Sequence, residues 1–450
     1  MGVVHCVDVG STFTKGVAVD LADGSLVATA SHPTTLPAGG VGDVMDGVRA
    51  VTTRLAETAQ PDETLACSSA GGGLRLAVVG HERAVTAEAG HRVGLSAGAR
   101  VVHVHAGPLD TAGVRGLRAS RPDVVLLVGG TDGGNADVLL HNAKRLARVA
   151  LPVVLAGNAD ARDEATALLG RRVVACDNVL PRIGVLEPWP ARAAIREVFL
   201  RHVIGGKGLS RGPDFARLVR GATPDVVLTG VEVLSDGTGG AGGGIPGAGD
   251  VLVVDVGGAT TDVYSVVTPE GEDASLRKDV VATLWRARTV EGDLGMRCNA
   301  PGVVAAGVAE RLVDDGERAG LEAAAVRLAG DPGFVPDDAA GLALDLRLAT
   351  LALTVALRRH ARPATPSSGG RDLRRVTTVV GSGGVLRHGS AAMRAAVLAP
   401  ATGDHAGGWR VPSSAKPTVD ADYVLFAAGL LADVAPAAAA ALVTRHLRPA

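Results

Sequence analysis

The sequence predicts an α/β protein of two lobes, with a doubly wound parallel α/β insertion in the first lobe. A short Val-rich run that ends in Asp and a glycine-containing turn occurs twice, at residues 3–15 and 251–262. Between the two, at about 100–186, short apolar runs alternate with helical patterns. A chain of 450 residues is also too long for one simple core, which favours two lobes.

The two Asp-led turns share one pattern. The first reads Asp-Val-Gly-Ser-Thr from Asp8, and the second reads Asp-Val-Gly-Gly-Ala-Thr-Thr-Asp from Asp255. Glycine lets backbone N–H groups approach a phosphate closely, and hydroxyl side chains add further donors. Carboxylates suit a magnesium ion that keeps most of its waters. Two such turns that face each other across a cleft predict a site for ATP and Mg²⁺, as in an actin-like (RNase H-like) ATPase.

The candidate residues divide by role. Asp8 and Asp255 are expected to hold the hydrated metal and to be catalytic, and Asp262 is expected to orient the attacking water or the metal shell. The predicted phosphate-binding residues are Gly10, Ser11, Thr12, Lys15, Gly257, Gly258 and Thr260. A third strand–glycine–helix pattern at 379–386 is expected on the adenosine side and contributes Gly381, Gly383 and Gly384. The alternative for this third segment is a tight helix–sheet contact without nucleotide.

The insertion is expected to be a parallel sheet with right-handed crossovers. Its strands are predicted at 101–105, 124–128, 153–156 and 173–176, with helices between them. The glycine-rich loop at 129–135 follows a strand, where open α/β sheets bind ligands, although a tight βα turn explains the same glycines. Upstream, strands are expected at 65–69 and 74–79 around a glycine turn, either as a close-approach loop or as a plain hairpin.

The domain limits follow from composition. Residues 235–249 are mostly glycine and predict a linker between a first lobe at 1–234 and a second lobe at 250–450. Helices are expected at 187–202 in the first lobe and at 302–313 and 339–360 in the second. Small residues at 427–429 suit a helix that packs closely at a hinge between the lobes.

Two acidic residues and two histidines are weaker candidates. Glu291 and Asp293 follow a strand and open a helix, so they can hold Mg²⁺ or orient water, or can cap the helix N-terminus. His103 and His105 alternate on one strand face, and polar residues with satisfied hydrogen bonds at a sheet edge explain them better than a metal pair.

Composition limits the partners and the compartment. Lys and Arg number 45 against 47 Asp and Glu, a formal charge of −2, and aromatic residues are 2%. This balance gives no support for a nucleic-acid partner. The four cysteines form no C-x-x-C pair and are interpreted as small buried residues in a reducing compartment. No signal peptide is visible, and the most apolar stretch, 423–443, is interrupted by Asp433 and Pro436, so a cytoplasmic protein without a membrane span is expected.

Several longer segments are more specific than the Asp-led turns. They lie at residues 8–12, 129–135, 181–186, 196–202, 207–210, 255–262 and 289–297. Together they resemble the glutamate mutase L family, also called the MutL family of methylaspartate mutase accessory proteins, which is unrelated to the mismatch-repair protein of that name. The resemblance runs nearly end to end. It implies that the chain is related to hydantoinase A. It also implies that the chain acts as an ATP-driven reactivating chaperone whose partner is an adenosylcobalamin-dependent mutase.

Two other classes of function stay open from the residues. A small-molecule kinase, or the ATP-using subunit of a hydantoinase- or oxoprolinase-like enzyme, has the same nucleotide cleft. A kinase also needs a carboxylate base near its substrate, for which Asp293 is a candidate. A nucleotide-gated protein that polymerises is a third interpretation. The insertion at about 100–186 favours a dedicated partner over a filament, and we expect it to be the docking surface.

Overall fold

The computed structural model describes residues 2–36, 42–70, 74–206, 208–239, 244–268, 286–362, 370–404 and 406–450. The chain forms two compact units. Unit 1 holds Met1–Thr229, Pro269–Ala287 and Gly429–Ala438, and unit 2 holds Gly230–Thr268, Arg288–Ala428 and Ala439–Ala450. The predicted lobe limits of 1–234, 235–249 and 250–450 stay a prediction.

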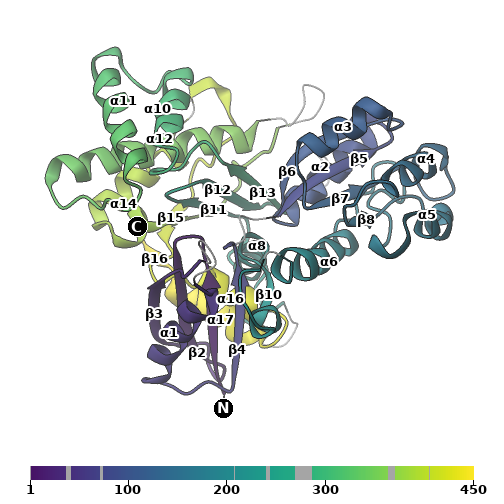
Figure 1. Ribbon diagram of the computed structural model, residues 1–450. Helices are drawn as coiled ribbons and strands as arrows, with labels where there is room; N and C mark the ends of the chain where they lie inside the picture. The colour runs from purple at the N-terminus through teal and green to yellow at the C-terminus, as the bar shows by residue number, and fades with distance from the viewer. Residues whose placement is uncertain are drawn as a thin grey trace. The chain divides into compact units, whose positions relative to one another are not determined.

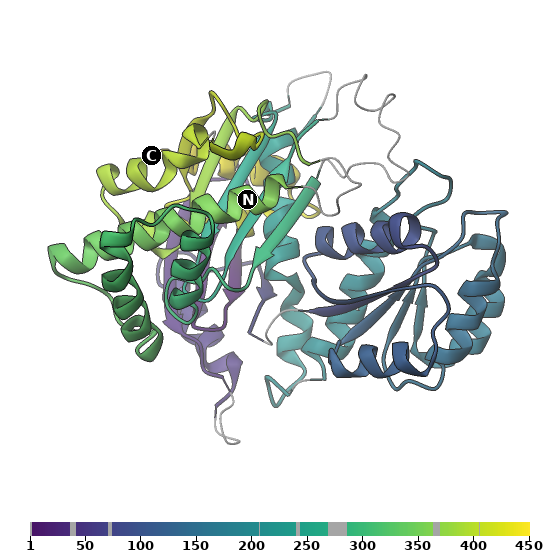
Figure 2. The same cartoon turned by 90° about the horizontal axis from the view of Figure 1, so that it is seen from above.

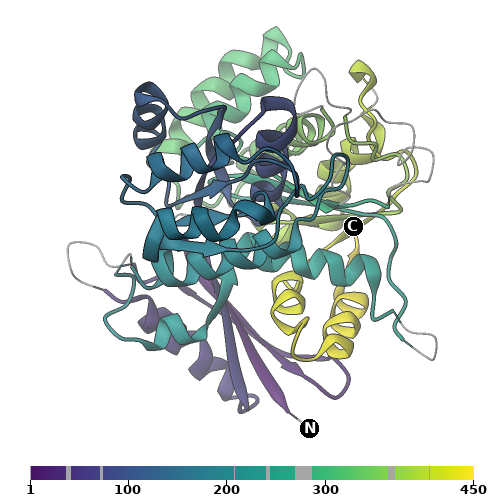
Figure 3. The ribbon, with the colours of Figure 1, turned by 90° about the vertical axis from the view of Figure 1, so that its right-hand side faces the viewer.

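The first sheet of unit 1 is built from the N-terminal strands (Figure 1; purple in Figure 3). Its order is β10-β4-β1-β2-β3. The strands span Val3–Val9 (β1), Phe13–Asp20 (β2), Leu26–Pro33 (β3), Glu63–Ser68 (β4) and Val219–Ala222 (β10). β1 pairs antiparallel with β2 and parallel with β4. Helix α1 (Val44–Ala56) buries Val51 and Leu55 against this sheet, and the Asp43 side chain caps its first turn.

The sheet of unit 2 repeats this arrangement. Its order is β13-β12-β11-β14-β15-β16. The strands span Val251–Val256 (β11), Thr261–Val266 (β12), Arg286–Glu291 (β13), Thr378–Ser382 (β14), Lys416–Val419 (β15) and Arg448–Pro449 (β16). β11 pairs antiparallel with β12 and parallel with β14. In chain order the first sheet runs 3-2-1-4-5 and the second runs 3-2-1-4-5-6. Both therefore contain the strand order 3-2-1-4-5 of the actin-like, RNase H-like fold, and the predicted fold class is confirmed.

Unit 1 also holds the predicted parallel insertion, with helices on both faces of its sheet (blue in Figure 2). The order is β6-β5-β7-β8-β9 and every neighbouring pair is parallel. The strands are Arg75–Gly80 (β5), Arg100–Ala106 (β6), Val124–Leu127 (β7), Val153–Leu155 (β8) and Val173–Ala175 (β9). Apolar side chains alternate between two separate cores, so both faces are buried. Helices α2 (Glu88–Ser96) and α6 (Trp189–Val198) cover one face, and α3 (Thr111–Ala119), α4 (Asp137–Leu146) and α5 (Arg162–Leu169) cover the other.

Two expectations about this region are wrong in detail. β4 and β5 do not form a hairpin, because β4 pairs with β1 and β5 pairs with β6 and β7. The parallel sheet therefore begins at Arg75, before the predicted limit near 100. The glycines at 71–73 lie outside the described residues. The helix predicted at 187–202 is α6, which a π-helical turn at Phe199–Ile204 continues.

The second core belongs to unit 2. Helices α10 (Ala300–Ala309), α11 (Asp315–Gly330) and α12 (Ala339–Ala361) pack with the sheet around residues such as Val254 and Leu353. In the part of the chain that the structure describes, only α12 is long and apolar enough to cross a membrane, and 56% of its apolar window is buried inside the protein. A core helix passes the same test. The stretch at 423–443, which the sequence marks as the most apolar, instead forms two shorter helices.

The remaining helices are short or connect the two units. The connecting helix α8 (Thr223–Asp236) passes from unit 1 to unit 2 between Thr229 and Gly230. The chain passes back within α16 (Leu425–Leu431), between Ala428 and Gly429. The others are α7 (Asp214–Leu218), α13 (Gly384–His388), α14 (Ala391–Leu398), α15 (Pro400–Gly403) and α17 (Pro436–His446).

Candidate functional site

The first Asp-led turn, called the first phosphate turn here after its predicted role, spans Gly10–Phe13 and closes the β1–β2 hairpin. The backbone N–H of Gly10 donates to the carbonyl oxygen of Phe13 at 3.1 Å. A Cβ at Gly10 would lie 2.7 Å from that same oxygen, so the turn requires glycine here. Ser11 and Thr12 are exposed at its tip, where they are available to a ligand. Thr34 fixes the turn from the side, because its hydroxyl donates to the carbonyl oxygen of Gly10 at 2.9 Å.

Asp8 is a buried carboxylate directly before this turn. The Thr223 hydroxyl, at the start of α8, donates to Asp8 Oδ1 at 2.5 Å, and the Cys67 thiol lies 3.5 Å from the same oxygen. Burial, and then the negative charge of Asp8, raise the pKa of the Cys67 thiol well above its usual value, so the thiol stays protonated and donates. Lys15 is the β2 residue opposite Asp8. Thr223 was not found by sequence reasoning, because it lies 215 residues from Asp8.

The second phosphate turn has the same geometry in unit 2. The backbone N–H of Gly257 donates to the carbonyl oxygen of Thr260 at 2.9 Å, as Gly10 does in the first turn. Asp255 lies opposite Asp262 across β11 and β12, as Asp8 lies opposite Lys15. The two turns therefore correspond residue by residue in the structure as well as in the sequence.

Asp262 is fully engaged by its own neighbours. Arg288, on β13, donates from Nε to Asp262 Oδ1 at 3.0 Å, and its Nη2 contacts the same oxygen. The hydroxyl of Thr260 donates to Asp262 Oδ2 at 3.0 Å. The side chains of Arg288 and Asp262 are 5% and 14% exposed. This carboxylate is thus neutralised by a buried guanidinium, a partner that the sequence pattern did not identify.

The predicted adenosine-side turn lies against the second phosphate turn. β14 ends at Ser382, which pairs with Asp255, and Gly383 follows with φ +97°. A Cβ at Gly383 would lie 2.1 Å from the carbonyl oxygen of Val256 and 3.0 Å from Asp255 Oδ1. Gly381 faces Leu386 and Leu398 in the core. A Cβ at Gly384 would have no neighbour within 4 Å, so of these three glycines it is the one that borders open space.

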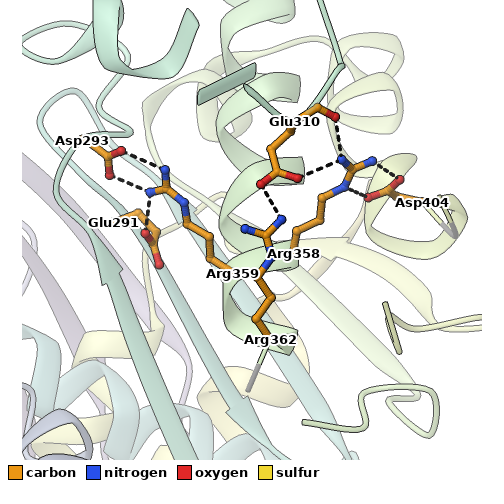
Figure 4. Close-up of polar contacts among 7 residues, drawn as sticks. All are labelled: Glu291, Asp293, Glu310, Arg358, Arg359, Arg362 and Asp404. Atoms are coloured by element: carbon orange, nitrogen blue, oxygen red, sulfur yellow. Dashed lines mark hydrogen bonds and ion pairs between the residues drawn. The ribbon is translucent and has the colours of Figure 1, made fainter. Parts of the chain in front are cut away.

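Glu291 and Asp293 share one arginine at the end of α12 (Figure 4). Arg359 Nη1 donates to Glu291 Oε2 at 2.8 Å and to Asp293 Oδ1 at 2.7 Å, and its Nη2 donates to Asp293 Oδ2 at 2.9 Å. Burial raises the pKa of Glu291, and Arg359 offsets part of that rise. The hydrogen bonds from Arg359 hold the pKa of Asp293 below its usual value. The expectation that these acids cap a helix is wrong, because the N-cap of α10 is Asn299.

The segment after Asp293 donates hydrogen bonds to the carbonyl groups of the second phosphate turn. The backbone N–H of Met296 donates to the Gly257 carbonyl at 3.0 Å, and that of Arg297 donates to the Gly258 carbonyl at 2.8 Å. The Asn299 amide donates to the Ala259 carbonyl at 2.8 Å. With its carbonyl groups bound in this way, the turn is held in one conformation before any ligand arrives.

Each Asp-led turn supplies one carboxylate of the kind that holds a hydrated Mg²⁺. Among the described residues no three His, Cys, Asp or Glu side chains are grouped to hold a metal ion. Mg²⁺ needs no such group, since it is usually held by one or two carboxylates together with phosphate oxygens and water. Asp8 and Asp255 each lie directly before the Val–Gly step of an Asp-led turn, and their role as metal ligands stays a prediction.

The other candidates of the sequence give a mixed picture. The rings of His103 and His105 are stacked 6.5 Å apart on the edge strand β6, and His103 Nε2 has no hydrogen-bond partner among the described residues. The edge position is as predicted, but the expected hydrogen bonding of His103 is wrong. Cys6 and Cys67 are buried and Cys176 is half-buried, whereas Cys298 is exposed, contrary to expectation.

The glycine-rich loop at 129–135 is held firmly in place. Asn178 donates to the Gly130 carbonyl at 3.0 Å and to Asp132 at 2.8 Å, and Asn158 donates to the Gly134 carbonyl at 2.8 Å. Its role in contacting a ligand or a partner stays a prediction. Lys207, in another of the family-like segments, lies outside the described residues.

Comparison with known proteins places the chain in context. A family model described as MutL protein matches residues 4–447. Protein MutL of Clostridium tetanomorphum is 35% identical over 462 residues, covering 98% of each chain. Among solved structures, the activator of 2-hydroxyisocaproyl-CoA dehydratase from Clostridium difficile with bound ADPNP is 11% identical, with a TM-score of 0.29, and covers 98% of this chain and 97% of its own. Ligand-bound xylulose kinase from Lactobacillus acidophilus is 11% identical, with a TM-score of 0.37, and the match covers 100% of this chain and 93% of the kinase chain.

Proposed function

The chain belongs to the MutL protein family, and from that premise we propose that it binds and hydrolyses ATP as a reactivating chaperone. Its partner would be an adenosylcobalamin-dependent mutase such as glutamate (methylaspartate) mutase. One observation carries the nucleotide part of this proposal, namely the Asp-led glycine turn that occurs twice in the same backbone register. Family membership supports the mutase part.

Each turn has residues suited to one part of the nucleotide. Gly10 and Gly257 would shape the two turns through their own backbone hydrogen bonds. Backbone N–H groups of Ser11, Thr12 and Gly258–Thr260, with the hydroxyls of Ser11 and Thr12, would bind phosphate oxygens. Asp8 and Asp255 would hold the water shell of Mg²⁺. When bound, the ion would neutralise charge on the phosphates and orient them for in-line attack. The exposed side of Gly384 would receive the adenosine.

The proposed work of the site is a change between two states. The two turns would make different contacts with ATP and with ADP, so hydrolysis would shift the equilibrium between two states of the protein. On a mutase, such a shift would release damaged cobalamin and admit intact cofactor. The proposed setting is cytoplasmic, with no nucleic-acid or membrane partner.

The replacement Asp255→Asn tests the nucleotide site. It removes the negative charge and keeps the shape, so Mg²⁺-dependent release of phosphate from ATP should fall on the order of 10²–10³-fold. Circular dichroism should show an unchanged fold, and Asp163→Asn, at an exposed position on α5, should retain wild-type turnover. Undiminished turnover in Asp255→Asn would remove the site. A small metabolite phosphorylated in step with ADP formation would instead establish a kinase.

A further inference from the structure

We propose that Glu291 is the general base that accepts a proton from the water attacking the γ-phosphate of ATP. This inference rests on the proposed ATPase and names a residue for its chemical step. Four carboxylates lie around the second phosphate turn, at Asp255, Asp262, Glu291 and Asp293. With Asp255 assigned to the metal, the hydrogen bonds of the other three decide between them.

Asp262 and Asp293 are both occupied on both oxygens. Asp262 accepts from Arg288 on Oδ1 and from Thr260 on Oδ2. Asp293 accepts from Arg359 on Oδ1 and on Oδ2, an end-on fork that uses both of its oxygens. A carboxylate in such a fork is a weak base, because each proton that it accepts must displace a charged donor.

Glu291 keeps one oxygen available. Its Oε2 accepts from Arg359 at 2.8 Å (Figure 4). Among the described residues, Arg359 is the only side chain that donates a hydrogen bond to Glu291, and Oε1 receives none. The side chain is 14% exposed, so the carboxylate is largely shielded from bulk water. Burial also raises its pKa, which brings it closer to the value that a base needs near neutral pH. Arg359 thus orients Glu291 through one oxygen and leaves the other for a water molecule.

Glu291 is also placed at the phosphate turn. It is the last residue of β13, and the backbone N–H of Leu294 donates to its carbonyl at 3.2 Å. The Leu294 carbonyl in turn accepts from the Thr261 hydroxyl at 2.6 Å, directly after the Gly257–Thr260 turn. The carboxylates of Glu291 and Asp262 are close enough for their charges to interact. The base and the phosphate-binding backbone therefore belong to one rigid group within unit 2.

The proposed step balances as an ordinary hydrolysis. The water oxygen forms a bond to the γ-phosphorus while the bond from that phosphorus to the β–γ bridging oxygen breaks. Glu291 Oε1 takes the proton that the water loses, and the electron pair of the broken bond stays on ADP. The products are ADP and inorganic phosphate, and Glu291 returns its proton to phosphate or solvent.

Glu291→Gln is the direct test, because glutamine keeps the oxygen that faces Arg359 but is not a base. In the full-length protein, kcat for ATP hydrolysis should fall on the order of 10²–10⁴-fold, with Mg·ATP affinity by calorimetry within about 2-fold of wild type. Glu310→Gln is the matched control, because Glu310 accepts from Arg358 and Arg362 on the other side of the same helix end (Figure 4). It should hydrolyse ATP at the wild-type rate.

The pH profile separates a base from a merely structural residue. Three charged groups face Glu291, namely Arg359 from α12, Asp293 from its own loop and Asp262 from β12. Arg359→Met removes the group that lowers the pKa of Glu291, so the acidic limb of kcat should move to higher pH.

Several results would overturn the assignment. One is an acidic limb of the kcat profile that stays at the wild-type pH in Arg359→Met. The others are a wild-type kcat in Glu291→Gln, or loss of ATP binding in Glu291→Gln. The absence of turnover in the wild-type protein would overturn the proposed ATPase together with it, whereas the other results leave the ATPase standing.

Discussion

His360 shows how a single buried residue makes the stability of unit 2 depend on pH. Its ring is fully buried and hydrogen-bonds the hydroxyls of Ser265 and Thr289, each at 2.8 Å. Burial, and then the positive charge of Arg371, lower its pKa well below the usual value. The folded protein therefore keeps His360 neutral, while the unfolded chain protonates it as the pH falls below about 6.5. Its contribution to stability is complete above that pH and is lost as the pH falls.

The first prediction of this section follows from that sign. Lowering the pH from 7.5 to 5.5 should cost about 1.4 kcal/mol of unfolding free energy through His360 alone, since one extra proton binds the unfolded chain. His360→Gln should be less stable at pH 7.5 but should show a pH dependence smaller by about that amount. Denaturant unfolding at both pH values measures this. His202→Gln, at an exposed site, should keep the wild-type dependence, and an equally steep dependence in His360→Gln would contradict the assignment.

At the scale of elements, the turn between β14 and α13 offers a matched pair of glycines. Gly383→Ala places a Cβ 2.1 Å from the Val256 carbonyl oxygen in a backbone of φ +97°, so it should cost more than about 2 kcal/mol of stability. Gly384→Ala meets nothing within 4 Å and should change stability by less than about 0.5 kcal/mol. If adenosine lies against Gly384, that variant should still bind ATP more weakly. Thermal unfolding and ATP titration of both variants give the answer, and equal stabilities would refute the steric argument.

The elements differ in how far they could be predicted. The two phosphate turns are local patterns, so their glycines and carboxylates are visible over eight or nine residues of sequence. The partners of their carboxylates are not visible, because Thr223 lies 215 residues from Asp8 and Arg288 lies 26 residues from Asp262. The hairpin that was one alternative for β4 and β5 is wrong for the same reason. A strand's own residues show that it is buried, whereas only the topology decides which sheet it joins.

For the whole molecule, the repeated pattern was enough to predict the fold class, because each half carries its own copy of the sheet and turn. The division of the chain is less simple than a single linker, since Gly429–Ala438 packs with unit 1 although it follows most of unit 2 in the chain. Two of the helices that connect the units carry residues named above. One holds a partner of a predicted site residue, and the other holds the small residues predicted at a hinge. α8 begins at the partner of Asp8, and α16 contains Ala427 and Ala428.

The last prediction concerns the partner, and it places docking on the parallel sheet of unit 1. One face of that sheet has a core of its own, whereas the core on its other face includes Val7 and Val9 of the first sheet. The parallel sheet contributes no residue to either phosphate turn, so charge reversals on its outer helices should leave the turns intact. Charge reversal on the helix α4 side of this sheet is best made at Lys144 and Arg148, whose side chains are exposed. Arg145 is less suitable, because it is half-buried and its Nη2 lies 3.4 Å from the Thr111 hydroxyl. Lys144→Glu with Arg148→Glu should weaken capture of an inactivated adenosylcobalamin-dependent mutase and abolish any stimulation of ATP turnover by it, with basal turnover unchanged.

The matched control is Arg327→Glu, an exposed reversal on α11 of unit 2, which should leave capture and stimulation as in the wild type. Each variant changes net charge in the same direction, so a general electrostatic effect would weaken capture in both, whereas a docking surface on the insertion separates them. Capture lost only in Arg327→Glu would transfer docking to unit 2. Stimulation that survives every reversal spread over the parallel sheet would show that its two buried faces serve to enlarge unit 1, and that the partner is recognised through other elements.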